Sequence, residues 1–477
     1  MAGCTHPATG SASRPDARDT GAAGAGDPYF PLLGNGGYDV AHYDLDLTYR
    51  PEDRHLTGTA TLTARATRDL AAFHLDLLGM TVEAVTVDGE PAAVRRAGQE
   101  LTVRPRTALV RGEEFRTTVR YAGRPRSVTD PDGSREGWLP TADGAIALGQ
   151  PTGSMTWFPG NHTPADKAAY DIAVTVPEGL TAVSVGALRS TRTADGRTTF
   201  HWHSPEPLAS YTATVGVGRY EVTESVLRAQ PRTEADGAGR ARRTLPVHTA
   251  VDPREAAAAR GVLARVPEVI AWGERTFGPY PFSAAGSIVE RGGDAGYALE
   301  THTRPVYPGA PDVLLVVHEL AHQWYGNSVT PRTWRDMWLN EGFATYAEWL
   351  WDEEHGGRSA QSVAEALYRG DYYDEAVEPG ANEAVWAFPP ADPPGAADIS
   401  QAPVYQRGAL VLHRVRRTIG DDAFRALLRD WPARHRHGNA DTAAFTAHVE
   451  RAAPEHRAAL RRVWDGWLYG EGKPPRP

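Results

Sequence analysis

The chain has 477 residues, of which 41% are hydrophobic and 23% are charged, and its formal net charge is -10. These values are typical of a folded globular protein with room for two or three domains. No segment approaches the roughly 18 consecutive apolar residues of a membrane-spanning helix, so a membrane span is excluded. Lysines and arginines form no basic stripe, which argues against nucleic acid as a ligand.

The first residues pose a question of localisation. Cys4 is the only cysteine, so no internal disulfide can form. The start Met-Ala-Gly-Cys resembles the end of a bacterial lipoprotein signal, and residues 5–27 are rich in Gly, Ala, Ser and Pro, like a tether. The charged and apolar parts of a signal peptide are missing. We therefore expect a disordered tail over residues 1–34 and a lipoprotein outside the cell or on its surface, with a cytoplasmic protein as the alternative.

Strand patterns dominate the residues after this tail. Alternating apolar and polar residues predict strands at 43–47, 56–66, 73–77, 82–87, 115–121, 170–176 and 211–217. The pairs Asp-Gly at 88–89, 132–133 and 195–196 predict turns between them. Residues 35–240 are therefore expected to form one all-β domain.

The pattern changes near Thr244, where longer helical segments begin with an Ala-rich run over residues 252–271. We place the domain boundary at residues 235–246 and expect a mainly helical domain over 241–477. A Pro-rich loop at 379–394 interrupts it. The fold class is therefore α+β, with an N-terminal β domain and a C-terminal helical one.

The sequence Val-His-Glu-Leu-Ala-His contains the spacing His-Glu-x-x-His. On a helix, residues four apart lie on one face, so the imidazoles of His318 and His322 can bind one ion. Glu319 lies one position further round, where it reaches a water beside the metal and not the metal itself. The Pro-Asp pair at 311–312 and the Gly-Asn pair at 326–327 predict the two ends of this helix.

A zinc site of this kind needs three protein ligands and one open position for water. Glu341 supplies a carboxylate directly before a second helical pattern at 343–350, which can pack against the first helix. Spacing alone leaves Glu348, Asp336 and Glu290 open as alternative third ligands.

Two longer runs resemble the aminopeptidase N family of zinc peptidases. Residues 318–327 read His-Glu-Leu-Ala-His-Gln-Trp-Tyr-Gly-Asn, and residues 334–344 read Trp-Arg-Asp-Met-Trp-Leu-Asn-Glu-Gly-Phe-Ala. In that family the third ligand is a glutamate downstream of the second histidine, and Glu341 stands at its position. The resemblance implies one Zn²⁺ per chain, bound by His318, His322 and Glu341.

Family members bind the free amino terminus of a substrate with the glutamate of a Gly-Ala-Met-Glu-Asn motif. Here residues 297–301 read Tyr-Ala-Leu-Glu-Thr, so the resemblance makes Glu300 the amine anchor, with Ala298 and Leu299 beside it in the substrate site. Leu299 replaces a methionine that lines the first side-chain pocket, which leaves the side-chain preference open. A second amine contact comes from the family's β domain, and Gln150 matches its spacing to an aromatic-Pro segment.

Residues 404–413 read Val-Tyr-Gln-Arg-Gly-Ala-Leu-Val-Leu-His and resemble the family's Tyr-x-Lys-Gly-Ala segment, with Arg407 where lysine is usual. The family's tyrosine donates a hydrogen bond to the oxygen of the tetrahedral intermediate. The resemblance therefore implies Tyr405 as a catalytic residue beside Glu319, which would act as the general base.

As a whole, the resemblance implies a saddle-like β domain followed by a thermolysin-like catalytic domain in a monomeric aminopeptidase that acts on peptides with a free amino terminus. Many members carry a further helical domain, which a chain that ends at Pro477 is too short to contain, so we expect a more open cleft. Three other functions stay open: a thermolysin-type endopeptidase, an epoxide hydrolase of the leukotriene-hydrolase branch, and a non-enzymatic scaffold. The chain retains His318, Glu319, His322, Glu341 and Tyr405, which argues against the scaffold.

Overall fold

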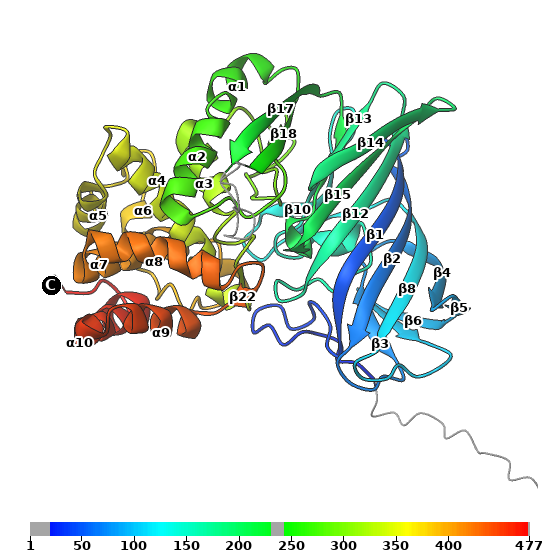
Figure 1. The fold of residues 1–477 in the computed structure, drawn as a ribbon, viewed down its shortest axis with the longest axis horizontal. Coiled ribbons are helices and arrows are strands. Elements are labelled where there is room, and N and C mark those ends of the chain that lie inside the picture. The colour runs from blue at the N-terminus through cyan, green and yellow to red at the C-terminus, as the bar shows by residue number, and fades with distance from the viewer. Residues whose placement is uncertain (1–19, 230–242, 476–477) are drawn as a thin grey trace, which may run out of the picture.

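A computed structural model describes residues 20–229 and 243–475 of the chain. It divides into a strand-rich N-terminal half, on the right in Figure 1, and a helix-rich C-terminal half on the left. The predicted α+β fold class is confirmed. No helix in the described ranges combines the length and apolarity that crossing a bilayer requires.

The N-terminal domain is built on an eight-stranded sheet with the order β14-β15-β12-β1-β2-β8-β4-β5. In its centre, β1 (Tyr38–Arg50) pairs antiparallel with β2 (His55–Ala66) and parallel with β12 (Lys167–Pro177). The remaining strands of this sheet are β4 (Thr81–Val87), β5 (Glu90–Pro91), β8 (Glu114–Gly123), β14 (Ala187–Ala194) and β15 (Arg197–Ala209). Alternate residues such as Leu45 and Leu47 are buried, so one face of the sheet covers the core and the other faces water.

Two smaller sheets complete this domain. One has the order β13-β16-β11-β10-β9 and the other the order β3-β7-β6. Their strands are β3 (Phe73–Asp76), β6 (Ala93–Ala97), β7 (Glu100–Arg104), β9 (Ser127–Thr129), β10 (Arg135–Pro140), β11 (Ala145–Leu148), β13 (Thr181–Ser184) and β16 (Val215–Gly218). The strand expected at 211–217 begins only at Val215, because Ser210–Thr212 form a 3₁₀ turn.

The C-terminal half opens with a four-stranded sheet, which the sequence patterns did not indicate. It comprises β17 (Glu221–Ala229), β18 (Arg243–Val251), β19 (Ala285–Val289) and β20 (Val306–Tyr307). The first two strands are antiparallel and the other pairs are parallel. Two short strands, β21 (Thr330–Pro331) and β22 (Asn439–Ala440), pair further along the chain.

The α-helices of the C-terminal half lie above, to the left of and below β17 and β18 in Figure 1, away from the N-terminal domain. In the described part of the chain they are α1 (Ala256–Leu263), α2 (Val266–Phe277), α3 (Val313–Ala321), α4 (Trp338–Glu354), α5 (Ala360–Arg369), α6 (Ala381–Ala384), α7 (Gly408–Ile419), α8 (Asp421–Arg434), α9 (Thr442–Ala452) and α10 (Arg457–Val463). The helical run expected at 252–271 is divided between α1 and α2. Pro267 stands in the first turn of α2, where its missing N–H is tolerated, and a continuous helix would clash with its ring.

The expected domain boundary, residues 235–246, can be compared with the pairing of the strands on either side of it. That range overlaps residues 230–242, which lie outside the described residues. β17 lies upstream of the range but forms one hairpin with β18, so it belongs to the second sheet. We therefore propose that the domains divide between β16 and β17, at residues 219–220.

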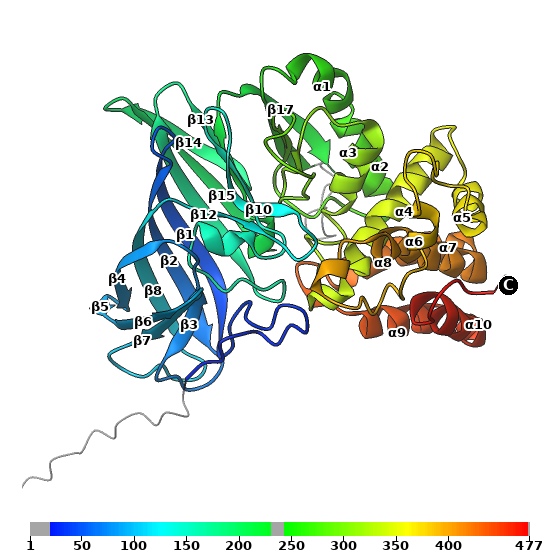
Figure 2. The same ribbon diagram turned by 180° about the vertical axis from the view of Figure 1, so that it is seen from behind.

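The expected tail over residues 1–34 is too long, because residues 20–34 pack against both domains. The carboxylate of Asp27 accepts hydrogen bonds from the backbone N–H groups of Tyr29 and Phe30, and from that of Trp334 in the catalytic domain at 2.8 Å. Phe30 meets the Trp334 ring edge-on, with centroids 6.2 Å apart. Figure 2 shows this dark blue segment running between the two halves. Cys4 lies outside the described residues, and its lipidation stays a prediction.

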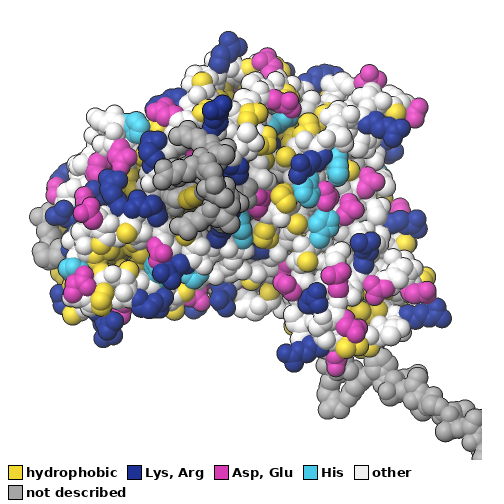
Figure 3. All heavy atoms as spheres, in the orientation of Figure 1, with side chains coloured by type: hydrophobic (Ala, Val, Ile, Leu, Met, Phe, Trp, Pro, Cys, Tyr) yellow, Lys and Arg dark blue, Asp and Glu magenta, His cyan; other side chains and the backbone are white. Residues whose placement is uncertain are grey.

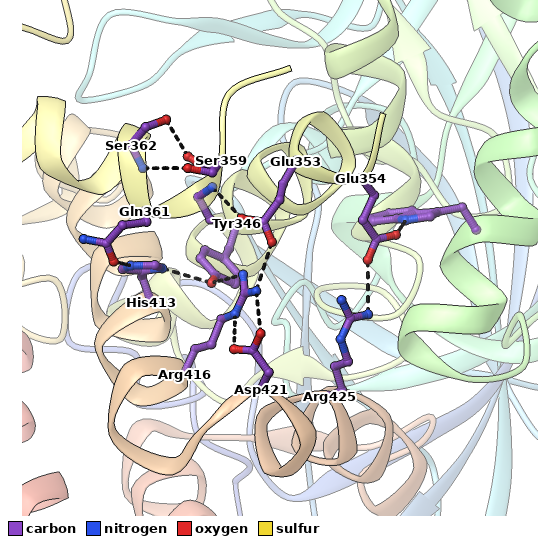
Figure 4. A network of polar contacts seen from close by, with 12 residues as sticks. Tyr346, Glu353, Glu354, Ser359, Gln361, Ser362, His413, Arg416, Asp421 and Arg425 are labelled. Atoms are coloured by element: carbon purple, nitrogen blue, oxygen red, sulfur yellow. Dashed lines mark hydrogen bonds and ion pairs between the residues drawn. The ribbon is translucent and has the colours of Figure 1, made fainter. Parts of the chain in front are cut away.

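A polar network holds α4 against the helices that follow it (Figure 4). The Arg416 guanidinium of α7 donates to Glu353 of α4 at 2.9 Å and to both carboxylate oxygens of Asp421 at the start of α8. His413 of α7 lies within hydrogen-bond distance of Tyr346 of α4. Charged hydrogen bonds of this kind are geometrically specific, so they fix how α4 and α7 lie against each other.

One lysine joins the two domains at the loop that follows α3. The Lys167 ammonium of β12 donates to the carbonyls of Asn327 and Ser328 at 2.8 and 2.9 Å, and to that of Gly438 at 3.3 Å. The Lys167→Met substitution removes three donors and leaves these acceptors without the lysine. We expect the free energy of unfolding to fall by about 1–3 kcal/mol, measured by urea denaturation.

Arg189→Met on exposed β14 is the matched control, and we expect it to change the unfolding free energy by less than about 0.5 kcal/mol. If both variants lose the same small amount of unfolding free energy, the hydrogen bonds of Lys167 do not stabilise the contact between the domains.

Candidate active site and metal centre

The first metal-binding helix begins where its sequence predicts and ends early. Asp312 caps α3, since its side chain accepts a hydrogen bond from the backbone N–H of Leu315 at 2.9 Å. The helix ends at Ala321 and not near the Gly-Asn pair at 326–327. His322 still bonds through its backbone N–H to the carbonyl of His318, so both imidazoles remain on one face.

The three predicted ligands converge on one point. Glu341 lies in the first turn of α4, and its Oε2 atom is 3.2 Å from His318 Nε2 and 3.3 Å from His322 Nε2. The three donor atoms lie within 4.8 Å of one another. Donors around one tetrahedral zinc, with bonds of about 2.0–2.2 Å, are about 3.3 Å apart. The residues present therefore fit a zinc ion.

The outer nitrogen of each imidazole has its own acceptor. His318 Nδ1 lies 2.6 Å from Glu348 Oε1, and His322 Nδ1 lies 3.0 Å from the carbonyl oxygen of Tyr325. An acceptor at Nδ1 fixes the ring orientation and leaves Nε2 free to bind a metal. Glu348, weighed above as a ligand, instead lies on the far side of His318 and orients it.

The other two alternative ligands lie in contacts of their own. Asp336 accepts hydrogen bonds from the backbone N–H and hydroxyl of Thr442. Glu290 bonds the Tyr220 hydroxyl at 2.5 Å. Neither belongs to a group of side chains that could hold an ion in the described residues. Of the four candidates for the third ligand, the structure therefore favours Glu341.

The electrostatics of the triad favour positive charge. Burial opposes charging of His322, but Glu341 and Glu300 raise its pKa to about 9. Burial also opposes ionisation of Glu341, but the neighbouring histidines lower its pKa to about 2. Burial raises the pKa of Glu319 to about 8. A divalent cation held by the triad favours the ionised form of Glu319, because an opposite charge nearby lowers the pKa of a carboxyl group.

Two glycines bring Tyr405 to the triad. Gly342 follows Glu341 directly, and a Cβ atom on it would lie 2.9 Å from the backbone of Gly408 at the start of α7. Only glycine allows this contact between α4 and α7. The Tyr405 ring, in the π-helical turn before α7, lies nearly parallel to the His318 ring with centroids 6.2 Å apart. Burial raises the pKa of Tyr405 well above its usual value, so its hydroxyl remains a donor at neutral pH.

Arg407 anchors the turn that carries this tyrosine. Its guanidinium is fully buried and donates to the carbonyls of Trp467, Phe388, Gly466 and Gly470. A lysine has three donors at one point and could not reach four acceptors spread around a planar group. Arg407, which stands where the family motif has lysine, therefore holds this segment through a different set of hydrogen bonds.

The site opens into a cavity of about 960 Å³ between the two domains. Among its lining residues are the triad, Glu319, Tyr405, Glu300 and Ala298 from the catalytic half, and Gln150 from the β domain. The expected substrate contact of Leu299 is not supported. Its backbone pairs with Val306, its side chain is buried in the hydrophobic core, and it does not line the cavity. In this extended segment Ala298 and Glu300 line the cavity and Leu299 between them does not, as alternation along a strand requires.

Three oxygen atoms in the cavity are buried and make no hydrogen bond to any residue that the structure describes. They are Glu300 Oε1, Glu319 Oε2 and Gln150 Oε1. Buried polar groups are normally paired, because an unpaired one costs about 1–3 kcal/mol. Three such acceptors in one cavity indicate a ligand with several hydrogen-bond donors.

The anchor segment, residues 297–304, is held in place by residues that the sequence analysis did not identify as functional. Asn327 Nδ2 donates to the carbonyl oxygen of Glu300 at 2.6 Å, and Gln323 Nε2 does so at 3.4 Å. The Tyr297 hydroxyl donates to the Gln150 carbonyl at 3.2 Å. Gln323 and Asn327 lie within residues 318–327, the run that resembles the aminopeptidase N family. That resemblance could have identified them from the sequence.

Comparison with known proteins finds matching family models and similar solved structures. Residues 40–212 match the Peptidase M1 N-terminal domain, and residues 311–467 match the Peptidase family M1 domain. The chain is similar to an M1 zinc metallopeptidase from Deinococcus radiodurans, with 30% identity, a TM-score of 0.80, and coverage of 95% of this chain and 98% of that one. A mutant form of that enzyme bound to a Tyr-Ser-Ala substrate gives 31% identity, a TM-score of 0.82, and coverage of 95% and 99%.

Curated relatives are more distant. Leukotriene A-4 hydrolase from Xenopus laevis is 24% identical over 466 residues, which are 92% of this chain and 72% of that protein. Aminopeptidase N from Streptomyces lividans is 24% identical over 458 residues. That match spans 89% of this chain but only 50% of the relative's length.

The contact between Glu348 and His318 can be tested by metal affinity. Because the carboxylate orients the imidazole, we expect Glu348→Ala to weaken zinc binding about 10- to 100-fold, measured by competition with a chromophoric chelator. Glu365→Ala on exposed α5 is the control and should leave the affinity unchanged. Equal affinities in all three proteins would remove Glu348 from any role at the metal.

Proposed function

The chain belongs to the M1 family of zinc metallopeptidases, and we propose that it removes amino-terminal residues from peptides, with one zinc ion per chain. One observation carries this proposal: Glu300 presents a buried, unpaired carboxylate oxygen in the same cavity as the His318, His322 and Glu341 triad. A carboxylate there binds a substrate ammonium group, which only a free amino terminus or a cationic side chain supplies.

Each of the residues that line the cavity has its own role in the reaction. Zinc, when held by the triad, polarises a carbonyl and lowers the pKa of a water molecule to about 7. Glu319 accepts the proton of the attacking water and passes it to the leaving amine. The Tyr405 hydroxyl donates a hydrogen bond to the oxygen on which negative charge develops. One such donor contributes about 2.7–4 kcal/mol to transition-state stabilisation.

Glu300 and Gln150 set the position of the cut. Their free oxygens come from opposite domains and line one cavity, so together they bind the substrate's ammonium group. Only the first peptide bond then reaches the catalytic residues. Ala298 lines the same cavity and leaves room for the first side chain.

A thermolysin-type endopeptidase shares the metal triad but needs no amine anchor. An epoxide hydrolase would act on a lipid. To distinguish these two functions from our proposal, hydrolysis of three kinds of compound is measured with and without a zinc chelator. They are fluorogenic aminoacyl amides, their N-acetylated counterparts and a lipid epoxide. Chelator-sensitive cleavage of the free-amine compounds alone supports an aminopeptidase, and cleavage of blocked peptides contradicts it.

We extend the proposal to a monomer that is lipidated at Cys4 and held outside the cell or on its surface. The Met-Ala-Gly-Cys start supports lipidation. Mass spectrometry of the protein from its native host tests the lipid, and light scattering after gel filtration tests the monomer. An unmodified Cys4 or a dimeric mass would contradict the respective part.

The role of Glu319 predicts a separation of turnover from metal binding. Because the amide of Glu319→Gln cannot accept a proton, we expect kcat to fall about 10²- to 10⁴-fold. Zinc content, measured by elemental analysis, should stay at the wild-type value because the triad is intact. Glu268→Gln on the surface of α2 is the control. Wild-type turnover in Glu319→Gln would show that another group is the base.

The role of Glu300 predicts a loss of discrimination. Removal of the carboxylate in Glu300→Ala takes away a charged hydrogen bond worth about 1.5–3 kcal/mol. We therefore expect kcat/KM for free-amine substrates to fall about 10- to 100-fold, while the rate with N-acetylated substrates does not fall. Glu300→Gln keeps the shape without the charge and should show most of the same loss. An unchanged ratio between the two substrate classes would place the anchor elsewhere.

A further inference from the structure

A group of three histidines and one aspartate, residue types that can bind metals, lies on the outer face of the eight-stranded sheet. The carboxylate of Asp171 contacts three histidines: Oδ2 is 2.9 Å from His42 Nε2, and Oδ1 is 2.9 Å from His203 Nδ1 and 3.4 Å from His201 Nε2. None of these four residues lines the active-site cavity. Figure 3 shows histidine side chains gathered on this face, over β1, β12 and β15.

Strand register explains why these side chains meet. β12 lies between β1 and β15, and Asp171 of β12 is directly opposite His203 of β15. His201 is two residues from His203 and therefore points to the same side of the sheet. Side chains opposite each other on one face have Cβ atoms about 4.5–5.5 Å apart, which is within reach of a shared ion.

We propose that Asp171, His201 and His203 bind a divalent transition cation such as Zn²⁺, and that His42 orients the carboxylate through its second oxygen. The donor set is the same as in the active site, two imidazoles and one carboxylate. The oxygen-to-nitrogen distances, 2.9 and 3.4 Å, are close to the 3.2 and 3.3 Å of the triad.

Two carboxylates lie on this part of the sheet. Partial burial opposes ionisation of Asp171, but the hydrogen bonds from His42 and His203 lower its pKa below the usual value. Asp44 of β1 is in register with Asp171 and is exposed beside it. A second carboxylate next to the donors adds negative potential, which attracts a divalent cation.

The two sites differ in preorganisation. In the triad, all three donor atoms lie within 4.8 Å of one another, whereas the donors around Asp171 do not meet that condition. At least one imidazole must therefore rotate to close on an ion. The side chains of His201 and His203 are 42% and 27% exposed, which leaves them room to do so. Because rotation costs free energy, we expect binding weaker than at the triad.

Metal stoichiometry tests the proposal. The full chain is dialysed against buffered Zn²⁺ alone at pH 7.5, where free imidazoles are neutral, and bound zinc is measured by elemental analysis. We expect two zinc ions per wild-type chain and one in the His201→Gln/His203→Gln double variant. His322→Gln should lose the triad ion and keep the outer one. This assignment does not depend on peptidase activity.

Two further variants provide a control with unchanged zinc binding and a variant with partly weakened zinc binding. His55→Gln at the start of β2 lies outside the group and should keep wild-type stoichiometry. His42→Gln should weaken the outer site about 10- to 100-fold without abolishing it, as loss of an orienting partner does. An unchanged thermal midpoint without added metal shows that each variant is folded. Equal zinc uptake by the wild type and the double variant would overturn the proposal.

Discussion

The Oε2 atom of Glu341 lies between the Nε2 atoms of His318 and His322, and this contact joins α3 to α4. Three titratable groups meet there in a buried place, which costs free energy unless their charges compensate. The outer acceptors of the two rings, Glu348 and the Tyr325 carbonyl, complete the compensation and fix the ring orientations. The rest of the site is arranged around this point.

The substrate side of the cavity depends on the joint between the domains. The anchor segment is tied to the catalytic half by Asn327, which donates to the Glu300 carbonyl. It is tied to the β domain through buried Arg304, whose guanidinium donates to the carbonyls of Ser184 and Gly186 and stacks 4.6 Å from the Trp202 ring. Lys167 adds a third link, from β12 to the loop after α3. The position of Glu300 relative to the triad therefore depends on both domains together.

The same donor types occur twice in this chain, with different degrees of order. In the cavity, helix packing and outer hydrogen bonds hold the donor atoms of two histidines and a glutamate within 4.8 Å of one another. On the outer sheet, strand register brings His201, His203 and Asp171 together, but their exposed side chains keep rotational freedom. We infer that preorganisation, more than donor chemistry, would distinguish the two groups as metal sites.

Sequence patterns predicted the fold class, several strands of the β domain, the start of α3 and the candidate ligands His318, His322 and Glu341. These follow from local rules: a period of two, a spacing of four on a helix, and one long motif that includes Glu341. Spacing could not choose between Glu341 and Glu348, because both lie on α4 and only packing shows which side of His318 each reaches.

Tertiary structure alone decided the remaining features. It placed residues 20–34 across both domains, gave β17 to the second sheet and turned Leu299 into the core. It also gathered His42, Asp171 and His203 from strands far apart in the chain. Each of these depends on contacts between residues distant in sequence, and no local pattern of hydrophobicity or turn residues encodes such contacts.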